Sequence, residues 1–178
     1  MQVVETYIKG LYTIDLTSHV DSRGEFVKTI HANTFEKFQL DFRFKESYFS
    51  ISNKNVIRGM HFQIPPDDQN KFVTLIKGRI IDVVVDLRKE SKSFGDYFAI
   101  ELSEKNRQGI YIGKGMAHGF ISLENDSILE YHTTTVYSEK NDKGINYRSF
   151  GFNWGVDTPI ISERDMNFPS FKSFNSPF

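Results

Sequence analysis

Apolar and polar residues alternate in short runs along most of the chain, and turn-forming residues interrupt these runs about every ten positions. Such alternation is typical of strands with one buried face. It predicts strands at residues 11–16, 25–30, 44–52, 56–63, 71–77, 97–102, 109–113, 120–123 and 127–137, and a strand buried on both faces at 79–87. The segment 18–24 is predicted to be a turn and 113–119 a glycine-rich bend.

One short helix is expected between these strands. Asn33 and Glu36 fit a capping box, which predicts a helix that ends near Leu40. Many short strands with frequent turns and little helix indicate an all-β antiparallel sandwich or barrel, and we expect a jelly roll, a double-stranded β-barrel with one or a few short helices. The phenylalanine-rich tail after Asn167 is expected to pack on the barrel or on a second subunit.

The stretch from residue 56 to residue 73 holds the densest polar chemistry in an apolar setting. On an extended strand, His61 and Gln63 share one face, because side chains alternate with period two. Lys71 opens the next strand after a proline-marked turn, so an antiparallel pairing of the two strands would bring it close to His61. Arg58 has the opposite parity, and a bulge at Gly59 is needed to turn it toward the same face.

Composition limits the possible partners. A chain of 178 residues with no linker-like segment is expected to form one domain, residues 1–178. A net charge of −1 gives no general attraction to nucleic acid or to a membrane, so we expect a small-molecule partner held by local charges. The absence of cysteine, of a signal peptide and of a membrane-spanning apolar run suggests the cytoplasm.

The candidate chemistry is proton transfer rather than metal catalysis. A metal site in a small barrel of this kind needs several histidines and a carboxylate, whereas here Lys71 stands near His61 and would repel a cation. We therefore expect no metal. His61 can act as a base near neutral pH, Lys71 can supply positive charge and Tyr131 can donate a proton. The alternative is that His61 is an ordinary hydrogen-bonded residue, which is the more common role of a lone histidine on a strand.

Several short sequence motifs resemble, in their order and spacing, those of a known family. They are VIRGMHFQ, QNKFV, VVVDLRKES, SFGDYFAIELSEKNRQ, MAHGF, LEYHTTTVYS and PIISERD. Between residues 21 and 165 the chain resembles the dTDP-4-dehydrorhamnose 3,5-epimerases, cupin enzymes of deoxysugar biosynthesis that use no cofactor. The resemblance implies a homodimer that epimerises a nucleotide-linked 4-keto-6-deoxyhexose at C3, C5 or both, in deoxysugar or cell-surface polysaccharide biosynthesis.

The resemblance also implies roles for individual residues. His61 matches the proton acceptor and Asp165 its paired acid, Tyr131 matches the proton donor on the opposite face of the sugar, and Lys71 lies at the keto oxygen. The positions implied to hold the substrate are Arg23, Arg58 and His118, to which we add Gln63 and Arg164.

Some positions depart from the family pattern. Glu46-Ser47-Tyr48 replaces a Gln-Asp-Asn run that contacts the nucleotide and sugar, and Lys28 replaces a glutamate. Glu46, Tyr48 and Lys28 are therefore further candidates for substrate binding. These changes spare the catalytic set, which suggests that the nucleotide or the sugar differs, or that one carbon alone is inverted.

Two other functions remain open from the sequence. A related cupin that moves the keto group between C3 and C4 would need no donor on the opposite face, so Tyr131 argues against this ketoisomerase. A sugar-nucleotide-binding module without turnover would have no need for His61, Asp165 and Tyr131 together.

Overall fold

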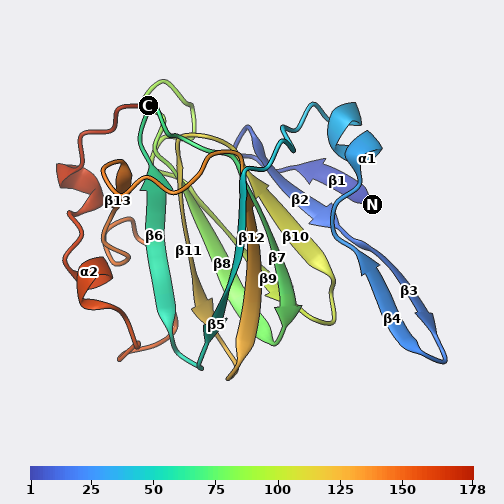
Figure 1. Cartoon of the computed structure of the whole chain (residues 1–178). Helices are drawn as coiled ribbons and strands as arrows, with labels where there is room; N and C mark the ends of the chain where they lie inside the picture. The colour runs from blue at the N-terminus through green and yellow to red at the C-terminus, as the bar shows by residue number, and fades with distance from the viewer.

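The computed structural model describes all 178 residues, and strands arranged in antiparallel sheets make up most of its ordered structure (Figure 1). The six-stranded sheet has the order β1 (Gln2–Glu5), β2 (Leu11–Asp15), β10 (Gln108–Ile112), β7 (Lys71–Lys77), β12 (Ser127–Thr133) and β5 (Glu46–Ser52). The five-stranded sheet has the order β13 (Asp142–Gly144), β6 (Ile57–Gln63), β11 (Met116–Ser122), β8 (Arg79–Asp86) and β9 (Tyr97–Ser103). The expected jelly roll is confirmed.

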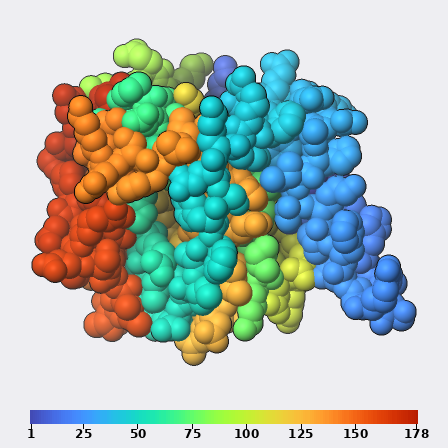
Figure 2. Space-filling model, in the orientation of Figure 1, coloured from blue at the N-terminus to red at the C-terminus, as the bar shows by residue number.

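Three short helices and one separate hairpin complete the chain. The helices are α1 (Ala32–Lys37), α2 (Glu163–Met166) and a 3-10 turn (Phe171–Ser173). The strands β3 (Thr17–Asp21) and β4 (Gly24–Lys28) pair only with each other. Their hairpin extends away from the two main sheets as an arm (Figures 1 and 2).

The main core lies between the two large sheets. Val73, Leu75 and Leu129 from the six-stranded sheet pack there with Val84 and Phe120 from the five-stranded sheet. Inward-facing apolar residues therefore hold the two sheets together, as the alternating pattern requires.

A second core covers the outer face of the five-stranded sheet. Val83 and Val85 of β8 point outward and pack with Trp154 of the long C-terminal segment. Phe171, Phe174 and Phe178 of the tail join the same cluster. The predicted burial of residues 79–87 on both faces is confirmed, and the tail packs on the barrel.

Several predicted boundaries are wrong. The turn predicted at residues 18–24 is too long: only Ser22 and Arg23 form the turn, because Thr17–Asp21 is a strand of the arm that pairs with Gly24–Lys28. α1 begins after His31, and no side chain caps it, so the capping box at Asn33 does not form. β12 ends at Thr133 rather than at residue 137. The strands β1 and β13 and the helical turns after residue 160 had no recognisable pattern.

The predicted glycine-rich bend at 113–119 is a turn followed by a regular strand, β11. Gly119 is needed there for the close packing of two strands rather than for a bend. A Cβ at this position would lie 2.6 Å from Met60 Sδ and 2.8 Å from the carbonyl oxygen of Arg58. Only glycine lets β6 and β11 approach this closely, and these two strands carry His61 and His118.

Candidate active site

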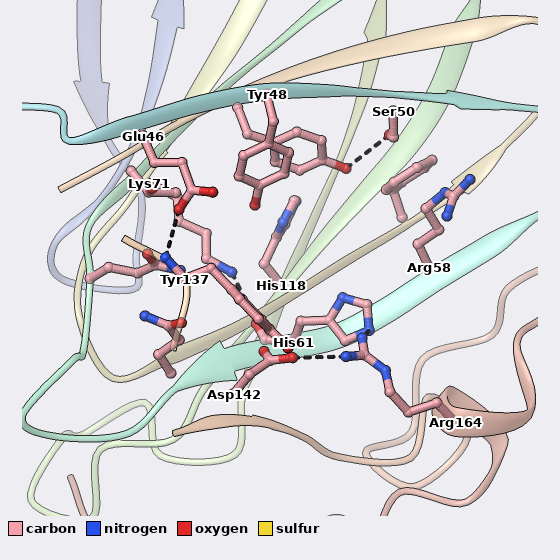
Figure 3. Close-up of a pocket in the computed structure, with 15 residues that line it drawn as sticks. Glu46, Tyr48, Ser50, Arg58, His61, Lys71, His118, Tyr137, Asp142 and Arg164 are labelled. Carbon is pink, nitrogen blue, oxygen red and sulfur yellow. Dashed lines mark hydrogen bonds and ion pairs between the residues drawn. The ribbon is translucent and has the colours of Figure 1, made fainter. Parts of the chain in front are cut away.

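A cavity of about 350 Å³ opens between the two large sheets (Figure 3). It brings together most of the side chains that the sequence indicated. The predicted residues that line it are Glu46, Tyr48, Arg58, His61, Gln63, Lys71, His118, Tyr131 and Arg164. They come from β5, β7 and β12 on one wall, from β6 and β11 on the other, and from α2 at the edge.

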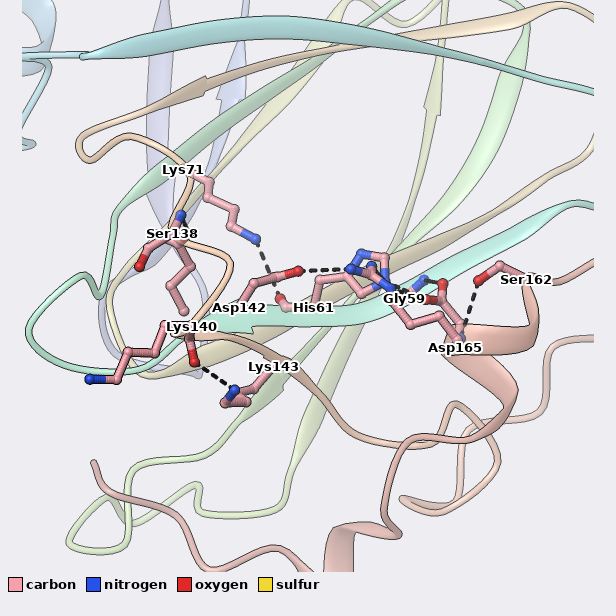
Figure 4. Close-up of polar contacts among 11 residues, drawn as sticks. Gly59, His61, Lys71, Ser138, Lys140, Asp142, Lys143, Ser162 and Asp165 are labelled. Carbon is pink, nitrogen blue, oxygen red and sulfur yellow. Dashed lines mark hydrogen bonds and ion pairs between the residues drawn. The ribbon is translucent and has the colours of Figure 1, made fainter.

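His61 and Asp165 form a hydrogen-bonded pair on the β6 wall. His61 Nε2 lies 2.9 Å from Asp165 Oδ1, and the other edge of the imidazole, with Nδ1, faces the cavity (Figure 3). Asp165 is buried behind the ring. Its backbone N–H donates to the Ser162 side chain that caps α2, and its Oδ2 accepts a hydrogen bond from the Gly59 N–H (Figure 4). The helix thus fixes the carboxylate, and the carboxylate fixes the imidazole.

The protonation states in this pair suit a general base. Burial lowers the pKa of His61, and the hydrogen bond and charge of Asp165 offset only part of that effect. Burial alone would raise the pKa of Asp165, but the hydrogen bond and charge of His61, together with the Gly59 N–H and the charge of Arg164, outweigh it and hold the value at about 2. At neutral pH the carboxylate is therefore ionised and accepts the Nε2–H, which leaves the Nδ1 lone pair directed into the cavity.

Arg164 links this pair to a second carboxylate. Its guanidinium lies 3.2 Å from Asp165 Oδ1 and 2.8 Å from Asp142 Oδ2, and it contacts His61 Nε2 at 2.9 Å. Because Nε2–H is donated to the ionised Asp165, both nitrogens in this last contact are donors, so it is a repulsive contact rather than a hydrogen bond. It adds positive charge near the ring and so contributes to the lowered pKa of His61.

Lys71 reaches the cavity from the opposite sheet. Strands β6 and β7 do not pair with each other, so the predicted antiparallel pairing is wrong. The two residues are nevertheless close, since Lys71 Nζ donates to the carbonyl oxygen of His61 at 3.3 Å across the barrel. Burial lowers the pKa of Lys71 to about 8, and Asp142 and Asp82 partly oppose that shift.

Two tyrosines form the wall that faces His61. Tyr131 on β12 is buried, and its hydroxyl lies 3.3 Å from Ser50 Oγ. Burial raises its pKa, so the phenol keeps its proton at any physiological pH. Tyr48 on β5 stacks against it, with ring centroids 4.8 Å apart.

His118 forms a second imidazole–carboxylate pair deeper in the cavity. Its Nε2 lies 2.8 Å from Asp82 Oδ2, and both side chains are buried. His118 lies directly opposite His61 in the pairing of β11 with β6. The two imidazoles therefore line neighbouring parts of one wall.

Arg58 faces the cavity because β6 is bulged. The register with β11 passes from His118↔His61 to Phe120↔Arg58, so β6 contains one extra residue at this point. Gly59 adopts φ +140° there, and a Cβ on it would lie 2.6 Å from Gly119 Cα. The predicted bulge is confirmed. Arg58 Nε donates to Ser52 Oγ at 3.0 Å, which holds the guanidinium at the mouth of the cavity.

Arg23 and Lys28 lie outside this cavity. Arg23 occupies the tip of the arm, where it pairs with Asp21 and its side chain is 88% exposed. Lys28 ends β4 and is exposed. Neither residue lines the cavity of its own chain, and their role in substrate binding stays a prediction.

Some lining residues were missed by the sequence reasoning. They are Ser50, Gln69, Phe120, Thr133, Tyr137 and Asp142. Ser50 could have been found, since it shares the face of Glu46 and Tyr48 on a strand of period two. Asp142 had no such signal, because it lies in the three-residue strand β13 within a turn-rich segment.

No group of three or more histidine, aspartate or glutamate side chains converges in the way that a metal ion requires. No helix combines the length and the apolar character that crossing a membrane requires.

The fold and the site define a class of protein: a cupin-type barrel whose interior carries acid–base groups on facing walls. Residues 5–173 match the family described as dTDP-4-dehydrorhamnose 3,5-epimerase. The enzyme of that name from Methanothermobacter thermautotrophicus is 37% identical over 170 residues, which cover 93% of this chain and 91% of the relative.

Solved structures agree with this assignment. The crystal structure of dTDP-4-dehydrorhamnose 3,5-epimerase from Sulfolobus tokodaii is 36% identical, with a TM-score of 0.92 over 99% of both chains. An epimerase from Legionella pneumophila, solved in complex with dTDP-4-keto-L-rhamnose, is 29% identical, with a TM-score of 0.92 over 98% of this chain and 94% of that one. The chain belongs to the dTDP-4-dehydrorhamnose 3,5-epimerase family, and the predicted class of enzyme, an isomerase that works by epimerisation, is confirmed.

Proposed function

We propose that this protein inverts C3, C5 or both in a nucleotide-linked 4-keto-6-deoxyhexose, with His61 as the base and Tyr131 as an acid on the opposite face of the sugar. The observation that carries the proposal is that these side chains line one cavity from facing sheets. A sugar ring held between them presents one face to the imidazole and the other to the phenol. The complex of the Legionella relative with dTDP-4-keto-L-rhamnose supports the substrate class.

The chemistry uses the acidity of carbons next to a ketone. His61 Nδ1 takes a proton from C3 or C5, and the electron pair of the broken C–H bond moves onto the C4 oxygen as an enolate. The Lys71 ammonium, in a site with little water, stabilises that negative charge. Tyr131 then delivers a proton from the other face, and the enolate electrons form the new C–H bond. The carbon is inverted without net oxidation or reduction.

The remaining cavity residues are suited to holding the substrate. Arg58 and Arg164 present guanidinium groups at the mouth, and such planar donors match phosphate oxygens. Gln63 is a poorer candidate for direct contact with the substrate. Its side-chain nitrogen donates to the backbone carbonyl of Val136, and its side-chain oxygen accepts a hydrogen bond from the backbone N–H of Ser138. We propose that Gln63 orders the segment that follows β12.

The arm points to a homodimer. Val20 and Phe26 on it are 77% and 62% exposed, and leaving such large apolar side chains in water is costly. We propose that the arm packs on a second copy and that Arg23 thereby reaches the partner's cavity. This arrangement reconciles its implied role with its distance from the cavity of its own chain.

Mixing two inactive variants tests the arm. If Arg23 acts in the partner's site, a mixed dimer of Arg23→Ala and His61→Ala subunits contains one intact site. Random reassociation of equal amounts is then expected to restore roughly a quarter of wild-type activity. Each variant alone, treated in the same way, is the control. Mixtures no more active than the separate variants, although the subunits have exchanged, would contradict the proposal.

Solvent deuterium tests the function itself. In D₂O, with dTDP-4-keto-6-deoxyglucose as substrate, the enzyme is expected to place deuterium at C3, C5 or both, with inversion, as NMR and mass spectrometry of the product can show. Retained configuration without exchange, under conditions in which the nucleotide sugar binds, would favour a non-catalytic binding module. Migration of the keto group to C3 would favour a ketoisomerase.

A further inference from the structure

The cavity contains a second phenol whose hydroxyl is not used by the protein. Tyr48 lies directly opposite Tyr131 in the pairing of β5 with β12, and the two rings stack at an interplanar angle of 17°. The Tyr131 hydroxyl is engaged by Ser50. The Tyr48 hydroxyl has no hydrogen-bond partner and points into the cavity, toward the wall that carries His118 and His61 (Figure 3).

The strand geometry makes this orientation a consequence of the sequence. Glu46, Tyr48 and Ser50 alternate along β5 and all line the cavity, while Phe49 and Ile51 face outward. Stacking on Tyr131 restricts movement of the Tyr48 side chain as a whole, which keeps its hydroxyl on the side of the cavity that faces His61.

The number of protons that the reaction consumes indicates a role for the Tyr48 hydroxyl. Each inversion consumes one proton delivered from the face opposite the base. A phenol holds one proton, and after donation it is a phenolate in a cavity that disfavours its charge. If two carbons of one bound sugar are inverted, either the same phenol must be reprotonated between the steps or a second donor must stand beside it.

We propose that Tyr48 is that second proton donor, which serves one of the two carbons flanking the ketone while Tyr131 serves the other. The inference rests on the proposed function. In each half of the reaction, His61 breaks a C–H bond and the electron pair forms the enolate. One phenolic O–H then breaks and the proton joins the opposite face of that carbon. The imidazolium passes its proton to solvent water before the second abstraction, and both phenolates take protons from water after the product leaves.

The electrostatics of the wall agree with donation. Desolvation inside the cavity, together with the charges of Glu46 and Asp142, raises the pKa of Tyr48 to about 12, although 43% of the residue remains exposed. Burial raises the pKa of Tyr131 as well. Both hydroxyls are therefore protonated when substrate arrives, so two protons are available on one face.

The test removes one oxygen atom at a time. Tyr48→Phe keeps the ring and its stacking on Tyr131, so a loss of activity in this variant reports the hydroxyl rather than the packing. Tyr131→Phe is the reciprocal variant. Tyr12→Phe deletes a phenolic oxygen elsewhere in the same sheet, outside the cavity, and is the matched control. Single turnovers in D₂O with dTDP-4-keto-6-deoxyglucose, followed by NMR, give the inversion rate at C3 and at C5 separately.

The wild-type enzyme and Tyr12→Phe are expected to invert both carbons. Tyr48→Phe is expected to slow inversion at one carbon by about 10²–10⁴-fold and to spare the other, with Tyr131→Phe showing the complementary loss. Wild-type inversion rates at both carbons in Tyr48→Phe would overturn the assignment. The same fold-loss at both carbons would overturn it as well. So would a wild-type enzyme that inverts one carbon only. A wild-type enzyme that binds this substrate and exchanges no deuterium would overturn the proposed function as well.

Discussion

His61→Ala is expected to lower kcat by about 10²–10⁴-fold, because Asp142, another potential proton acceptor on the β6 wall, is paired with Arg164. His118 is the nearest imidazole on that wall, but it is buried in its own pair with Asp82. Product formation measured at saturating dTDP-4-keto-6-deoxyglucose checks the prediction. The KM is expected to change less than kcat, since the imidazole acts on the reacting proton rather than on the nucleotide.

Two further variants separate the base from its support. Asp165→Asn keeps the shape of the side chain but removes the charge that fixes the Nε2–H tautomer, so it is expected to lower kcat by less than His61→Ala. His31→Ala, at the start of α1 and outside the cavity, is the histidine control and should retain wild-type activity. A His61→Ala variant within a few-fold of wild type would exclude His61 as the base.

The alternating pattern identified the walls of the site because both walls are strands with one face inward. His61 and Gln63 share an inward face on β6, and Tyr131 lies on an inward face of β12, as period two requires. The same rule could not reveal the arm. Its second strand was predicted at residues 25–30, but its first strand, Thr17–Asp21, has no buried face and its sequence SHVDSRG resembles a turn.

Contacts between distant segments were harder to predict. The closeness of His61 and Lys71 was expected from a hairpin, whereas in the structure it arises from two facing sheets. Asp165 meets His61 from a four-residue helix 104 positions away, and only the family resemblance linked them. Asp142 completes the charge network from an edge strand of three residues, which no periodicity can signal.

The charged residues around His61 also allow the site to meet two different charge requirements of the reaction. Deprotonation needs a neutral imidazole, and enolate stabilisation needs a cation within the same cavity. Arg164 and Asp142 lie on the side of His61 that faces Asp165 and β13, while Lys71 approaches from the other sheet. The lysine can therefore remain charged beside the enolate while the histidine stays uncharged, provided that the pH lies between their two pKa values.

Lys71→Met is expected to lower kcat by about 10²–10³-fold, because it removes the cation that stabilises the enolate and keeps most of the apolar stem. The pH profile gives a second, independent readout. The pKa of Lys71 is lowered to about 8, so the ammonium form is lost as the pH rises through that value. The pKa of His61 is lowered from 6.5, so the basic form is present above a pKa on the acid side of that value. The wild-type kcat/KM should therefore rise with pH on the acid limb and fall above about pH 8.

Lys71→Arg is the matched variant, because a guanidinium stays protonated far above pH 8. It is expected to be less active than wild type through altered geometry, but its alkaline limb should move to higher pH. Lys71→Met should lose the limb near pH 8 and keep the acid limb set by His61. If the fall near pH 8 persists unchanged in both variants, a different group titrates there, and the enolate is stabilised by something other than Lys71.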